Sequence, residues 1–482
     1  MPTVARQATR QRAAHDILVQ VVTRVVNLAL GVVVTALLAR ALGSVGYGQW
    51  STILIVLTLI SYIANFGMQN IAVREAARDP EHEHEWIGAV IMLRLIILGP
   101  VIALSVAAIF LMQQSHQMLV AGLILIVTMP FSGVGALQLV FQLRVKNLVP
   151  MLVLTLRSVL WAIAVAIVYW KGAGMIALAI GLSATNAIGS VVQAVAALRA
   201  APRRPRPSRA RLGALVRAGL PLGISGMLIM SYARIDQVLV FQIIGSRAAG
   251  LYGSVYNVLE QSSFVPISIL TTLAPIMAAA WPGDRARLLR TARLCAEMMA
   301  IASLGALAFA SVAATPFVRL IFGPQFVRGA PALPVLGAAF VFICFGYLNG
   351  NMLVVLGLQR RLIFISLLAL AVNLVGNLIL IPQVGFMGAA WMTLGTEIVV
   401  FGASLRLILR TLELPRPKAG RIGRTVLAAA LLAGGLGLLR LAGAPLGVLT
   451  LAACLCYPAL LLGLRALSVG DIRVILRREQ LA

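Results

Sequence analysis

Long runs of apolar residues, separated by short polar segments, follow one another along almost the whole chain. Each run is long enough to cross a hydrocarbon core of about 30 Å as a helix. The pattern lacks the short alternating segments that are typical of membrane β-strands. It predicts about fourteen transmembrane helices, near residues 17–39, 50–72, 87–112, 117–141, 150–170, 174–198, 217–243, 249–279, 292–315, 331–357, 362–381, 385–409, 424–442 and 446–466.

The composition supports this fold class. Hydrophobic residues make up 61% of the 482 residues and charged residues only 11%, whereas about a quarter of a soluble domain is charged. Such a chain has too few polar groups to cover its surface in water. We therefore expect an all-α integral membrane protein.

The basic residues predict an orientation. With the N-terminus in the cytoplasm, most of the 40 Lys and Arg residues fall in cytoplasmic loops and tails. The opposite side then holds only Arg40, Lys171, Arg247, Arg319, Arg328 and Arg440. This asymmetry follows the positive-inside rule and predicts that both termini are cytoplasmic. The net charge of +26 is thus a topology signal, because dispersed charges with few aromatics do not favour nucleic-acid binding.

Two distant stretches resemble each other. "ALGSVGYGQW" (residues 41–50) and "IIGSRAAGLY" (residues 243–252) each place a Gly-Ser turn after a predicted helix, followed by Gly and an aromatic residue. Six crossings separate the copies, so both turns point the same way. A parallel repeat predicts two six-helix bundles related by a pseudo-two-fold axis along the membrane normal. We expect the aromatic residues, Trp50 and Tyr252, at interface depth.

The repeat divides the chain into four parts. Residues 1–198 form an N-terminal six-helix lobe, 199–217 a basic cytoplasmic linker, 218–409 a C-terminal six-helix lobe, and 410–482 two extra transmembrane helices with a cytoplasmic tail. Prolines in the linker are expected to prevent helix formation. Its charges predict contact with anionic lipid headgroups, and docking of a partner protein is an alternative.

The repeated hairpins resemble a known family. "LARALGSVGYGQWSTILIVLTLISYIANFGMQNIAVREAARD" (38–79) and "SYARIDQVLVFQIIGSRAAGLYGSVYNVLEQ" (231–261) are similar to matching hairpins of the polysaccharide-biosynthesis flippases. These Wzx-type transporters share a superfamily with multidrug extruders and lipid II flippases. The resemblance implies movement of an undecaprenyl-pyrophosphate-linked oligosaccharide across the inner membrane by alternating access, for O-antigen, capsule or exopolysaccharide synthesis.

Polar residues at helical spacing indicate inward-facing stripes. They occur as Gln20, Arg24, Asn27 and Thr35; as Thr58, Ser61 and Asn65; as Ser183, Asn186, Ser190 and Gln193; as Ser254, Asn257 and Gln261; and as Asn373 with Asn377. Several such stripes in one chain favour a wet cavity. Hydrogen bonding between helices, worth about 0.6 kcal/mol each, is the alternative for any single stripe.

Three arginines lie inside predicted helices of the N-terminal lobe. By the predicted boundaries, Arg24, Arg94 and Arg157 lie at one level, about 10 Å deep. A ring of guanidinium groups fits a pyrophosphate, because arginine binds phosphate with two donors. Snorkelling to the headgroups is the alternative for Arg94 and Arg157. The candidate substrate-binding residues are therefore Arg24, Asn27, Arg94, Arg157 and Asn65.

The C-terminal lobe instead carries carboxylates at membrane depth. Asp236, Glu260 and Glu397 are candidates for coupling to H⁺ or Na⁺, and structural ion pairs between helices are the alternative. Arg234 is two residues from Asp236, so the two side chains cannot face each other on one helix. Each must find another partner.

No sequence motif indicates catalysis. A phosphate-binding Gly-Lys-Ser/Thr loop is lacking, and "EHEHE" (81–85) is interpreted as an acidic solvated turn rather than a metal site. Cys295, Cys344, Cys454 and Cys456 lie in apolar runs and are expected to be small core residues. We expect neither an enzyme nor a cofactor. A membrane glycosyl polymerase is the main enzyme alternative. It would need a long, charged outer loop, whereas the predicted outer loops are short and nearly uncharged.

Several functional hypotheses stay open beside the oligosaccharide flippase. They are a lipid II flippase, a multidrug/cation antiporter and a non-transport scaffold; the basic first lobe argues against the antiporter and the polar stripes against the scaffold. The expected partners are the lipid-linked oligosaccharide and the phospholipid bilayer. A polysaccharide polymerase or another assembly protein is a further candidate.

Overall fold

A computed structural model describes residues 2–65, 68–112, 115–132, 137–143, 148–200, 205–206, 208–414 and 420–467. Within its helices it does not describe the side chains of residues 2–22, 24, 25, 28, 63–65, 70, 132, 221, 222 and 225. The candidate residues Arg24 and Asn65 are among these, so their side chains lie outside the described part. The chain divides into two compact units, Met1–Met230 and Ser231–Ala482. The division falls inside a helix rather than in the predicted linker.

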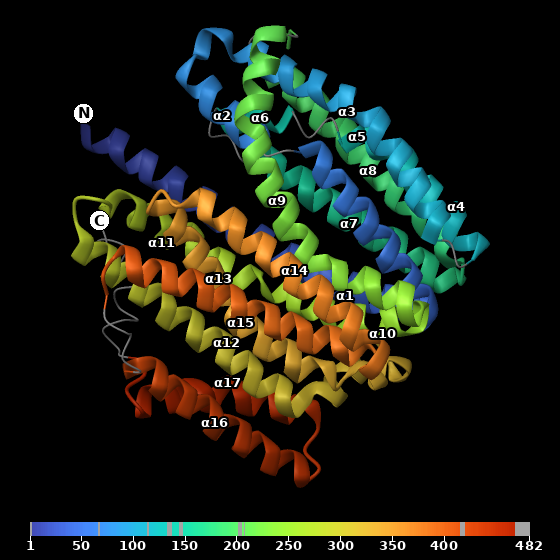
Figure 1. Cartoon of the computed structure of the whole chain (residues 1–482), viewed down its shortest axis with the longest axis vertical. Helices are drawn as coiled ribbons and strands as arrows, with labels where there is room; N and C mark the ends of the chain where they lie inside the picture. The colour runs from blue at the N-terminus through green and yellow to red at the C-terminus, as the bar shows by residue number, and fades with distance from the viewer. Residues whose placement is uncertain are drawn as a thin grey trace. The chain divides into compact units, whose positions relative to one another are not determined.

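The described residues form helices and no strands (Figure 1). In the order of the chain, they are α1 (Pro2–Asn65), α2 (Met68–Arg78), the 3-10 helix η1 (Pro80–His82), α3 (Glu83–Met112), α4 (His116–Val127), α5 (Met129–Ser132), α6 (Gln138–Leu143), α7 (Leu148–Lys171), α8 (Gly174–Ala200) and α9 (Arg209–Ile244). There follow α10 (Ser246–Ser262), α11 (Phe264–Ala280), α12 (Arg285–Ile321), the 3-10 helix η3 (Pro324–Gly329), α13 (Ala332–Val355), α14 (Gln359–Val384), α15 (Phe386–Thr411), α16 (Gly420–Leu441) and α17 (Leu446–Gly463).

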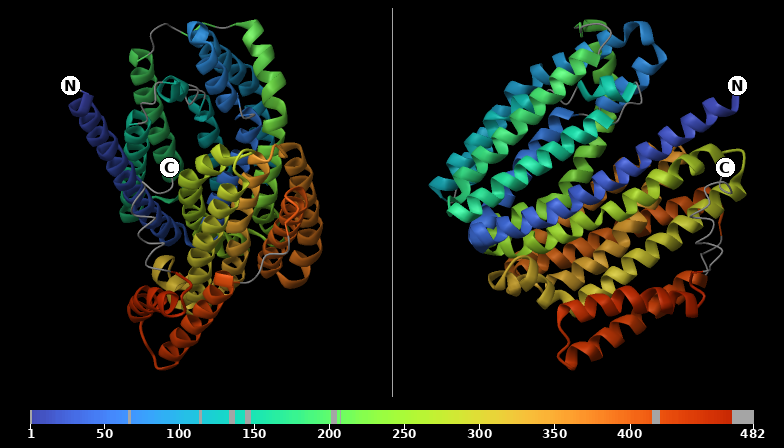
Figure 2. Two further views of the ribbon diagram at one scale, coloured as in Figure 1. Left: turned by 90° about the vertical axis from the view of Figure 1, so that its left-hand side faces the viewer. Right: turned by 180° about the vertical axis from the view of Figure 1, so that it is seen from behind.

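The predicted repeat adopts the same backbone conformation in both units. Gly43 interrupts α1 with φ 65° and ψ 179°, and Gly245 separates α9 from α10 with φ 106° and ψ 178°. Residues with a Cβ are essentially excluded from this region of the backbone map. Glycine is therefore required at both turns. In Figure 2 the first part of α1 extends from the N-terminus in the darkest blue.

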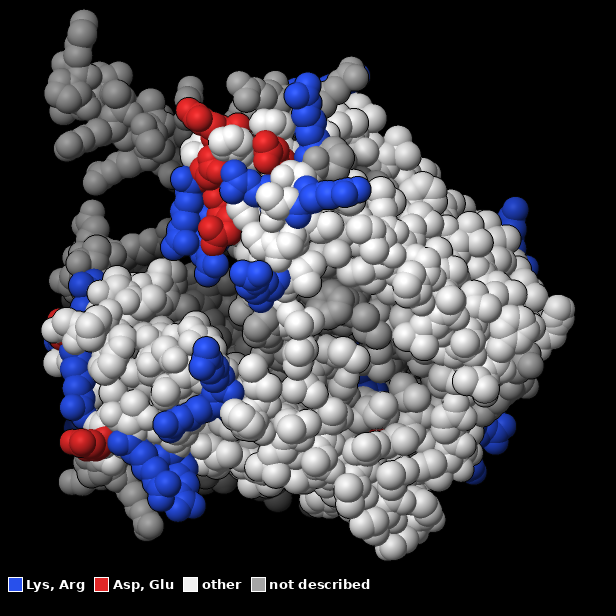
Figure 3. All heavy atoms as spheres, turned by 45° about the horizontal axis from the view of Figure 1, so that its top comes forward, with Lys and Arg blue, Asp and Glu red and all other residues white. Residues whose placement is uncertain are grey.

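The all-α membrane fold is confirmed. Twelve segments of the described chain are long and apolar enough to span a membrane, and His116–Phe131 is a shorter apolar helix. One of the twelve, Ala29–Tyr62, contains the break at Gly43 and so covers two predicted helices. With this division and the shorter helix, the segments correspond to the predicted runs. Figure 3 agrees, because most of the face that it shows carries no charged side chain.

One predicted helix is interrupted within the described residues. The run 117–141 changes from α4 to α5 at Thr128, because Pro130 lacks the N–H that would continue a regular helix from the turn before it; residues 133–136, before α6, lie outside the described part. Thr128 ends α4, and its backbone N–H donates to Leu125 and Ile126 carbonyls. The run 50–72 is described as α1 up to Asn65 and as α2 from Met68, and residues 66 and 67 between them lie outside the described part.

The linker prediction differs from the structure at both ends. Helix α8 continues to Ala200 and α9 begins at Arg209. The Ser208 hydroxyl accepts from the Arg211 backbone N–H at 3.5 Å, which is the geometry of an N-cap at the long end of its range. The helix therefore starts as soon as the last linker proline is passed, within the basic segment. The acidic turn is also more helical than predicted, since Glu83 and Glu85 lie in the first turn of α3.

The two extra helices, α16 and α17, pack on α12 in the second unit (Figure 1). The Tyr457 hydroxyl donates to the Ile301 carbonyl at 2.8 Å, and Gly305 leaves room for the Tyr457 ring, since a Cβ there would lie 2.5 Å from it. Arg421 and Glu297 form an ion pair at 3.1 Å. Cys295 and Cys344 are buried as predicted, but Cys454 and Cys456 are exposed on α17. A lipid-facing position accepts such apolar side chains as readily as a core does.

Candidate functional site

Asp236 of α9 lies at the centre of a buried hydrogen-bond cluster in the second unit. Its Oδ2 atom accepts from the Tyr252 hydroxyl of α10 at 2.5 Å and from the Thr393 hydroxyl of α15 at 3.1 Å. Its Oδ1 atom accepts from the Gln237 backbone N–H at 2.8 Å. Asp236 is 1% exposed. Donors from three helices thus replace the water that a carboxylate would otherwise need.

The cluster continues along α14 and α15. One turn from Thr393, the Thr396 hydroxyl accepts from Asn373 Nδ2 at 3.3 Å. Asn377 Nδ2 in turn donates to Asn373 Oδ1 at 2.9 Å. Asn377 is completely buried, and its Oδ1 atom has no hydrogen-bond partner in the described part of the chain. The predicted stripe on α14 therefore faces inward, and it supplies an acceptor that is still available.

Arg234 and Asp236 bind different partners, as their spacing predicts. Arg234 forms an ion pair with Glu260 of α10, and its guanidinium lies over the Tyr256 ring, 5.6 Å from the centroid. The Tyr256 hydroxyl donates to the Ala233 carbonyl at 2.5 Å. Glu260 is thus tied to a structural ion pair in this conformation. The structure therefore supports a role in ion coupling less well for Glu260 than for Asp236.

Glu397 of α15 is the third predicted carboxylate. It is 9% exposed, and no hydrogen bond or ion pair joins it to the described residues. A Cβ added to Gly346 of α13 would lie 3.8 Å from Glu397 Oε2, so the carboxylate lies close to the α13 backbone. A buried carboxylate without a compensating donor is costly as an anion.

In the first unit, Asn27 connects α1 to α7. Its Nδ2 atom donates to the Thr23 carbonyl at 2.7 Å and to the Thr155 hydroxyl at 3.1 Å. Its Oδ1 atom is buried without a hydrogen-bond partner among the described residues. Asn27 therefore lies inside the helix bundle, as the stripe on the first helix predicts, and keeps one acceptor open.

Arg157 also belongs to α7, two residues beyond the contact made by Asn27. Its Nη2 atom donates to the Ser190 hydroxyl of α8 at 2.9 Å. Ser190 is 3% exposed, so the guanidinium lies against a buried hydroxyl. Asn27 of α1 thus contacts α7 at Thr155, two residues before Arg157. Arg94 lies on α3, which packs against α1 and α4.

The sequence did not single out two parts of this arrangement. Tyr252 is completely buried and bonded to Asp236, a contact that its predicted interface depth did not indicate; Trp50, its counterpart in the repeat, is also buried. Thr393 was not identified at all. The aromatic residue of the repeat was the available signal, because a buried tyrosine usually requires a partner for its hydroxyl.

A second charged cluster fastens the start of α9 to the turn between α2 and α3. Arg211 Nη2 lies 2.8 Å from Asp79 Oδ2, and Arg211 Nε lies 3.6 Å from Glu85 Oε2. The Arg211 guanidinium is 5.0 Å from the centroid of the Trp86 ring. Asp79 Oδ1 also pairs with His82 Nδ1 at 2.8 Å. Figure 3 shows acidic side chains gathered with basic ones in this region.

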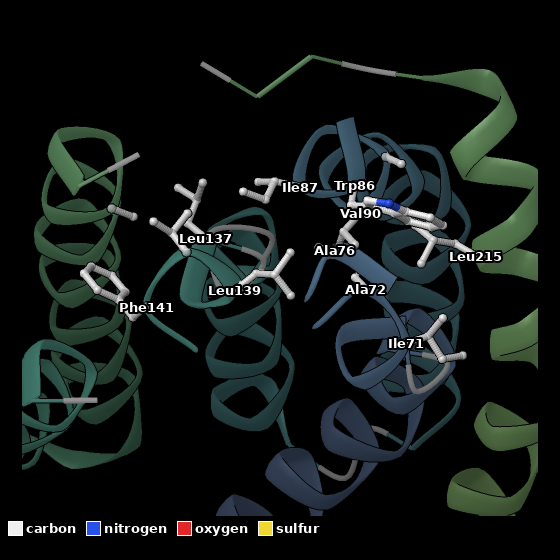
Figure 4. Close-up of a cluster of buried hydrophobic side chains, with 13 residues drawn as sticks. Ile71, Ala72, Ala76, Trp86, Ile87, Val90, Leu137, Leu139, Phe141 and Leu215 are labelled. Atoms are coloured by element: carbon white, nitrogen blue, oxygen red, sulfur yellow. The ribbon is translucent and has the colours of Figure 1, made fainter. Parts of the chain in front are cut away.

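Backbone and apolar contacts complete this attachment. The Arg206 N–H donates to the His84 carbonyl at 3.1 Å. Gly88 permits the close approach, since a Cβ there would lie 2.0 Å from the Arg206 carbonyl oxygen. Figure 4 shows Leu215 of α9 beside Trp86 of α3. The "EHEHE" segment and its neighbours therefore anchor the second half of the predicted linker, from Arg206 to Leu215.

Comparison with known proteins supports a transporter architecture. A family model described as "Polysaccharide biosynthesis protein" matches residues 13–281. An uncharacterized membrane protein, MJ1068, from Methanocaldococcus jannaschii is 25% identical over 174 residues, which are 35% of this chain and 33% of that protein. The chain thus matches about a third of the length of this curated relative.

Two kinds of solved transporter share the fold. The lipid II flippase MurJ in an inward closed conformation is similar with a TM-score of 0.73 and 13% identity, over 96% of this chain and 100% of that one. An inward-facing multidrug resistance transporter of the MATE family, of the MOP superfamily, is similar with a TM-score of 0.67 and 17% identity, over 81% and 96%. At such identities the likeness concerns the fold alone.

Proposed function

The chain belongs to the polysaccharide biosynthesis protein family, and we propose that it is the flippase for an undecaprenyl-pyrophosphate-linked oligosaccharide. It would carry repeat units for O-antigen, capsule or exopolysaccharide from the inner to the outer leaflet of the cytoplasmic membrane. Family membership and a transporter fold support export across a membrane. The choice of substrate depends on the chemistry of the first unit.

The observation that carries this choice is the position of Arg157. A guanidinium has five N–H donors, and Arg157 uses one of them on Ser190. Its Nε atom is buried and has no hydrogen-bond partner among the described residues. A phosphate group accepts several such donors at once, and arginine binds it in a bidentate manner. Arg24 and Arg94 are proposed to contribute to the same anion site, with Asn27 and Asn65 beside it.

We propose that the second unit couples this movement to H⁺ or Na⁺. Asp236 is the strongest candidate, because its carboxylate is buried and accepts hydrogen bonds from residues of three helices. The Tyr252 and Thr393 hydroxyl oxygens lie against its carboxylate. Glu397 is a candidate for proton exchange. Glu260 is a weaker one, because Arg234 already neutralises it.

The second candidate function is export of a different substrate by the same fold. The structural likeness to MurJ favours a lipid II flippase, and that to the MATE family favours a drug/cation antiporter. A lipid II flippase would use the same pyrophosphate chemistry. An antiporter for cationic drugs would not need arginine in the first unit.

Deletion of the gene followed by lipid extraction tests the proposal. We expect a sugar-loaded polyprenyl pyrophosphate to accumulate on the cytoplasmic leaflet, with loss of surface polysaccharide. Accumulation of lipid II would assign the chain to the peptidoglycan pathway instead. Unchanged glycolipids with greater sensitivity to cationic drugs would contradict the flippase and support the antiporter.

A further inference from the structure

The side chain of Arg157 lies in a notch of α8. A Cβ added to Gly189 would come 2.1 Å from Arg157 Nε, 2.4 Å from its Cγ and 2.7 Å from its Cδ. The arginine stem therefore occupies the space where any other residue at position 189 would carry its side chain. Gly189 is itself buried. A methyl group at this position would force the arginine to move.

The next residue fixes the end of the same side chain. The Ser190 hydroxyl accepts from Arg157 Nη2 at 2.9 Å and is 3% exposed. Gly189 thus leaves room for the Cγ–Cδ–Nε part of the Arg157 side chain (its stem), and Ser190 binds the guanidinium group at its end (its fork). Two adjacent residues define both the path and the orientation of the guanidinium.

This placement differs from that of an arginine that snorkels. Arg157 lies about 14 Å from the first residue of α7, and Ser190 about 15 Å from the last residue of α8, at 1.5 Å per residue. A snorkelling side chain extends toward the helix end to reach the headgroups. Here the side chain is instead held by Gly189 and Ser190 of the neighbouring helix.

The notch leaves most of the fork available. Ser190 takes one donor of the five in the guanidinium, and Nε is buried against Gly189, so the other N–H groups of the two Nη atoms are the ones left for an anion. A hydrogen bond made only to join α7 and α8 would not require a glycine beneath the stem. An arginine that binds an anion does benefit from a fixed geometry, because bidentate binding depends on the direction of the fork.

We propose that Gly189 and Ser190 are positioning residues that orient Arg157 toward the pyrophosphate of a lipid-linked substrate. The inference rests on the proposed function, since it assigns one group of the anion site and the residues that hold it. Arg157 contacts the phosphate, and the two α8 residues act through Arg157. Replacing either of them weakens pyrophosphate binding only while the arginine is present.

A double-mutant cycle tests this dependence. The purified full-length protein is titrated with undecaprenyl pyrophosphate and, in parallel, with undecaprenol, which has the same tail without phosphate. We expect wild type to prefer the pyrophosphate, and Arg157→Ala to lose most of that preference. Gly189→Ala and Ser190→Ala should each reduce it by about tenfold or less, because a displaced fork loses part of a bidentate contact. Neither should weaken binding further in the Arg157→Ala background.

Matched controls come from the same helix. Gly181→Ala also adds a methyl between α8 and α7, where a Cβ would lie 3.1 Å from that of Ala164. Ser183→Ala removes a hydroxyl that donates to the Ile124 carbonyl at 3.4 Å. Both should keep the wild-type preference for pyrophosphate. Arg157→Lys should bind with intermediate strength, because it keeps the charge and loses the fork. Binding is compared only among variants whose melting temperature and elution volume match those of the wild-type protein.

The outcomes separate the two proposals. If Gly189→Ala and Ser190→Ala weaken binding equally with and without Arg157, they act on packing and the positioning role is refuted. If Arg157→Ala retains the full preference, the arginine is not a phosphate ligand and the inference fails while the flippase proposal stands. If wild type binds both lipids equally, the pyrophosphate substrate itself is wrong, and the inference is overturned with it.

Discussion

Tyr252 and Asp236 are joined by a hydrogen bond of 2.5 Å between α10 and α9, with both side chains buried. Tyr252 stands in the repeated turn segment, so the second unit uses a residue of the repeat to hold its buried carboxylate. A hydrogen bond to a charged group contributes about 1.5–3 kcal/mol. This relationship links the architecture of the repeat to the candidate ion site.

We expect Tyr252→Phe to lower the stability of the protein by about 1.5–3 kcal/mol, because Asp236 loses its shortest donor. Thr393→Val should cost less, since the 3.1 Å bond from Thr393 is longer. Melting in detergent measures both. In an Asp236→Asn background the two substitutions should become much milder. A Tyr252→Phe protein as stable as wild type would show that the hydroxyl contributes nothing at this site.

The carboxylates of the second unit differ in their surroundings, and their amide variants should differ accordingly. Asp236→Asn is expected to abolish the dependence of transport on an imposed ion gradient. Glu397→Gln should alter a proton-dependent component, and Glu260→Gln should act mainly by releasing Arg234. Transport in liposomes with H⁺ or Na⁺ gradients provides the measurement. Unaltered gradient dependence in all three variants would assign these residues to structure.

Arg24 lies on α1, on the helical face that also carries Asn27. Arg24→Ala is expected to insert and fold, because removal of a charge from a membrane helix relieves a burial cost, yet to fail in restoring surface polysaccharide. Arg24→Lys should be intermediate, since an ammonium attracts phosphate without binding it in a bidentate manner. The readout is polysaccharide at matched protein level. Full activity of Arg24→Ala would remove Arg24 from the anion site.

Asp79 should make the attachment of α9 sensitive to acid. The hydrogen bond with His82, with the positive charges of His82 and Arg211, holds the pKa of Asp79 below its ordinary value of 3.8 despite an opposing effect of desolvation. A lowered pKa in the folded state stabilises the protein above the ordinary value, and this contribution is lost as the pH falls through the folded-state pKa. In the wild-type protein, the start of α9 should therefore detach from the turn between α2 and α3 only in strong acid.

Tryptic cleavage after Arg209, which is followed by Ala210, reports this detachment. Asp79→Asn and Arg211→Ala should be cut faster than wild type at neutral pH, because each breaks the ion pair at 2.8 Å. Glu81→Gln is the matched control, since Glu81 is exposed in the same turn and is not part of that pair. Equal cleavage of all four proteins would show that the segment is held by its backbone and apolar contacts alone.

The turn glycines should be intolerant of a side chain for reasons of backbone conformation. Gly245→Ala meets no heavy atom within 4 Å, so its whole cost arises from φ and should be about 1–3 kcal/mol. Gly213→Ala, in the first turns of α9 and also in open space, should be neutral or stabilising by up to about 1 kcal/mol. Thermal unfolding distinguishes the two. A neutral Gly245→Ala would mean that the turn adopts another conformation.

Hydropathy predicts where the helices cross, because the length of an apolar run is a local property. It does not predict their interruptions equally well. The break of the fourth run follows from Pro130, whereas the start of α9 at Arg209 depends on a cap from Ser208 that is hidden in a basic segment. Periodicity also predicted that Ser190 and Asn377 face inward, and both are buried.

The partners of these residues could not be predicted from the sequence. Arg157 and Ser190 are 33 positions apart, and Arg211 and Asp79 are 132 apart. Such pairs depend on how each helix is rotated about its axis and which neighbour it meets. Glu260 shows the same limit, because its depth indicated ion coupling or an ion pair without deciding between them. The contact with Arg234 required the packing of α9 against α10.

The matching conformations of Gly43 and Gly245 have a consequence for the history of the gene. Every single-base change in a glycine codon that alters the residue adds a side chain or ends the chain, and this backbone region excludes side chains. If the two halves arose by duplication, drift could erase most of their likeness but not these two positions. The two glycines thus give a fixed pair of positions from which the two halves of this chain can be aligned.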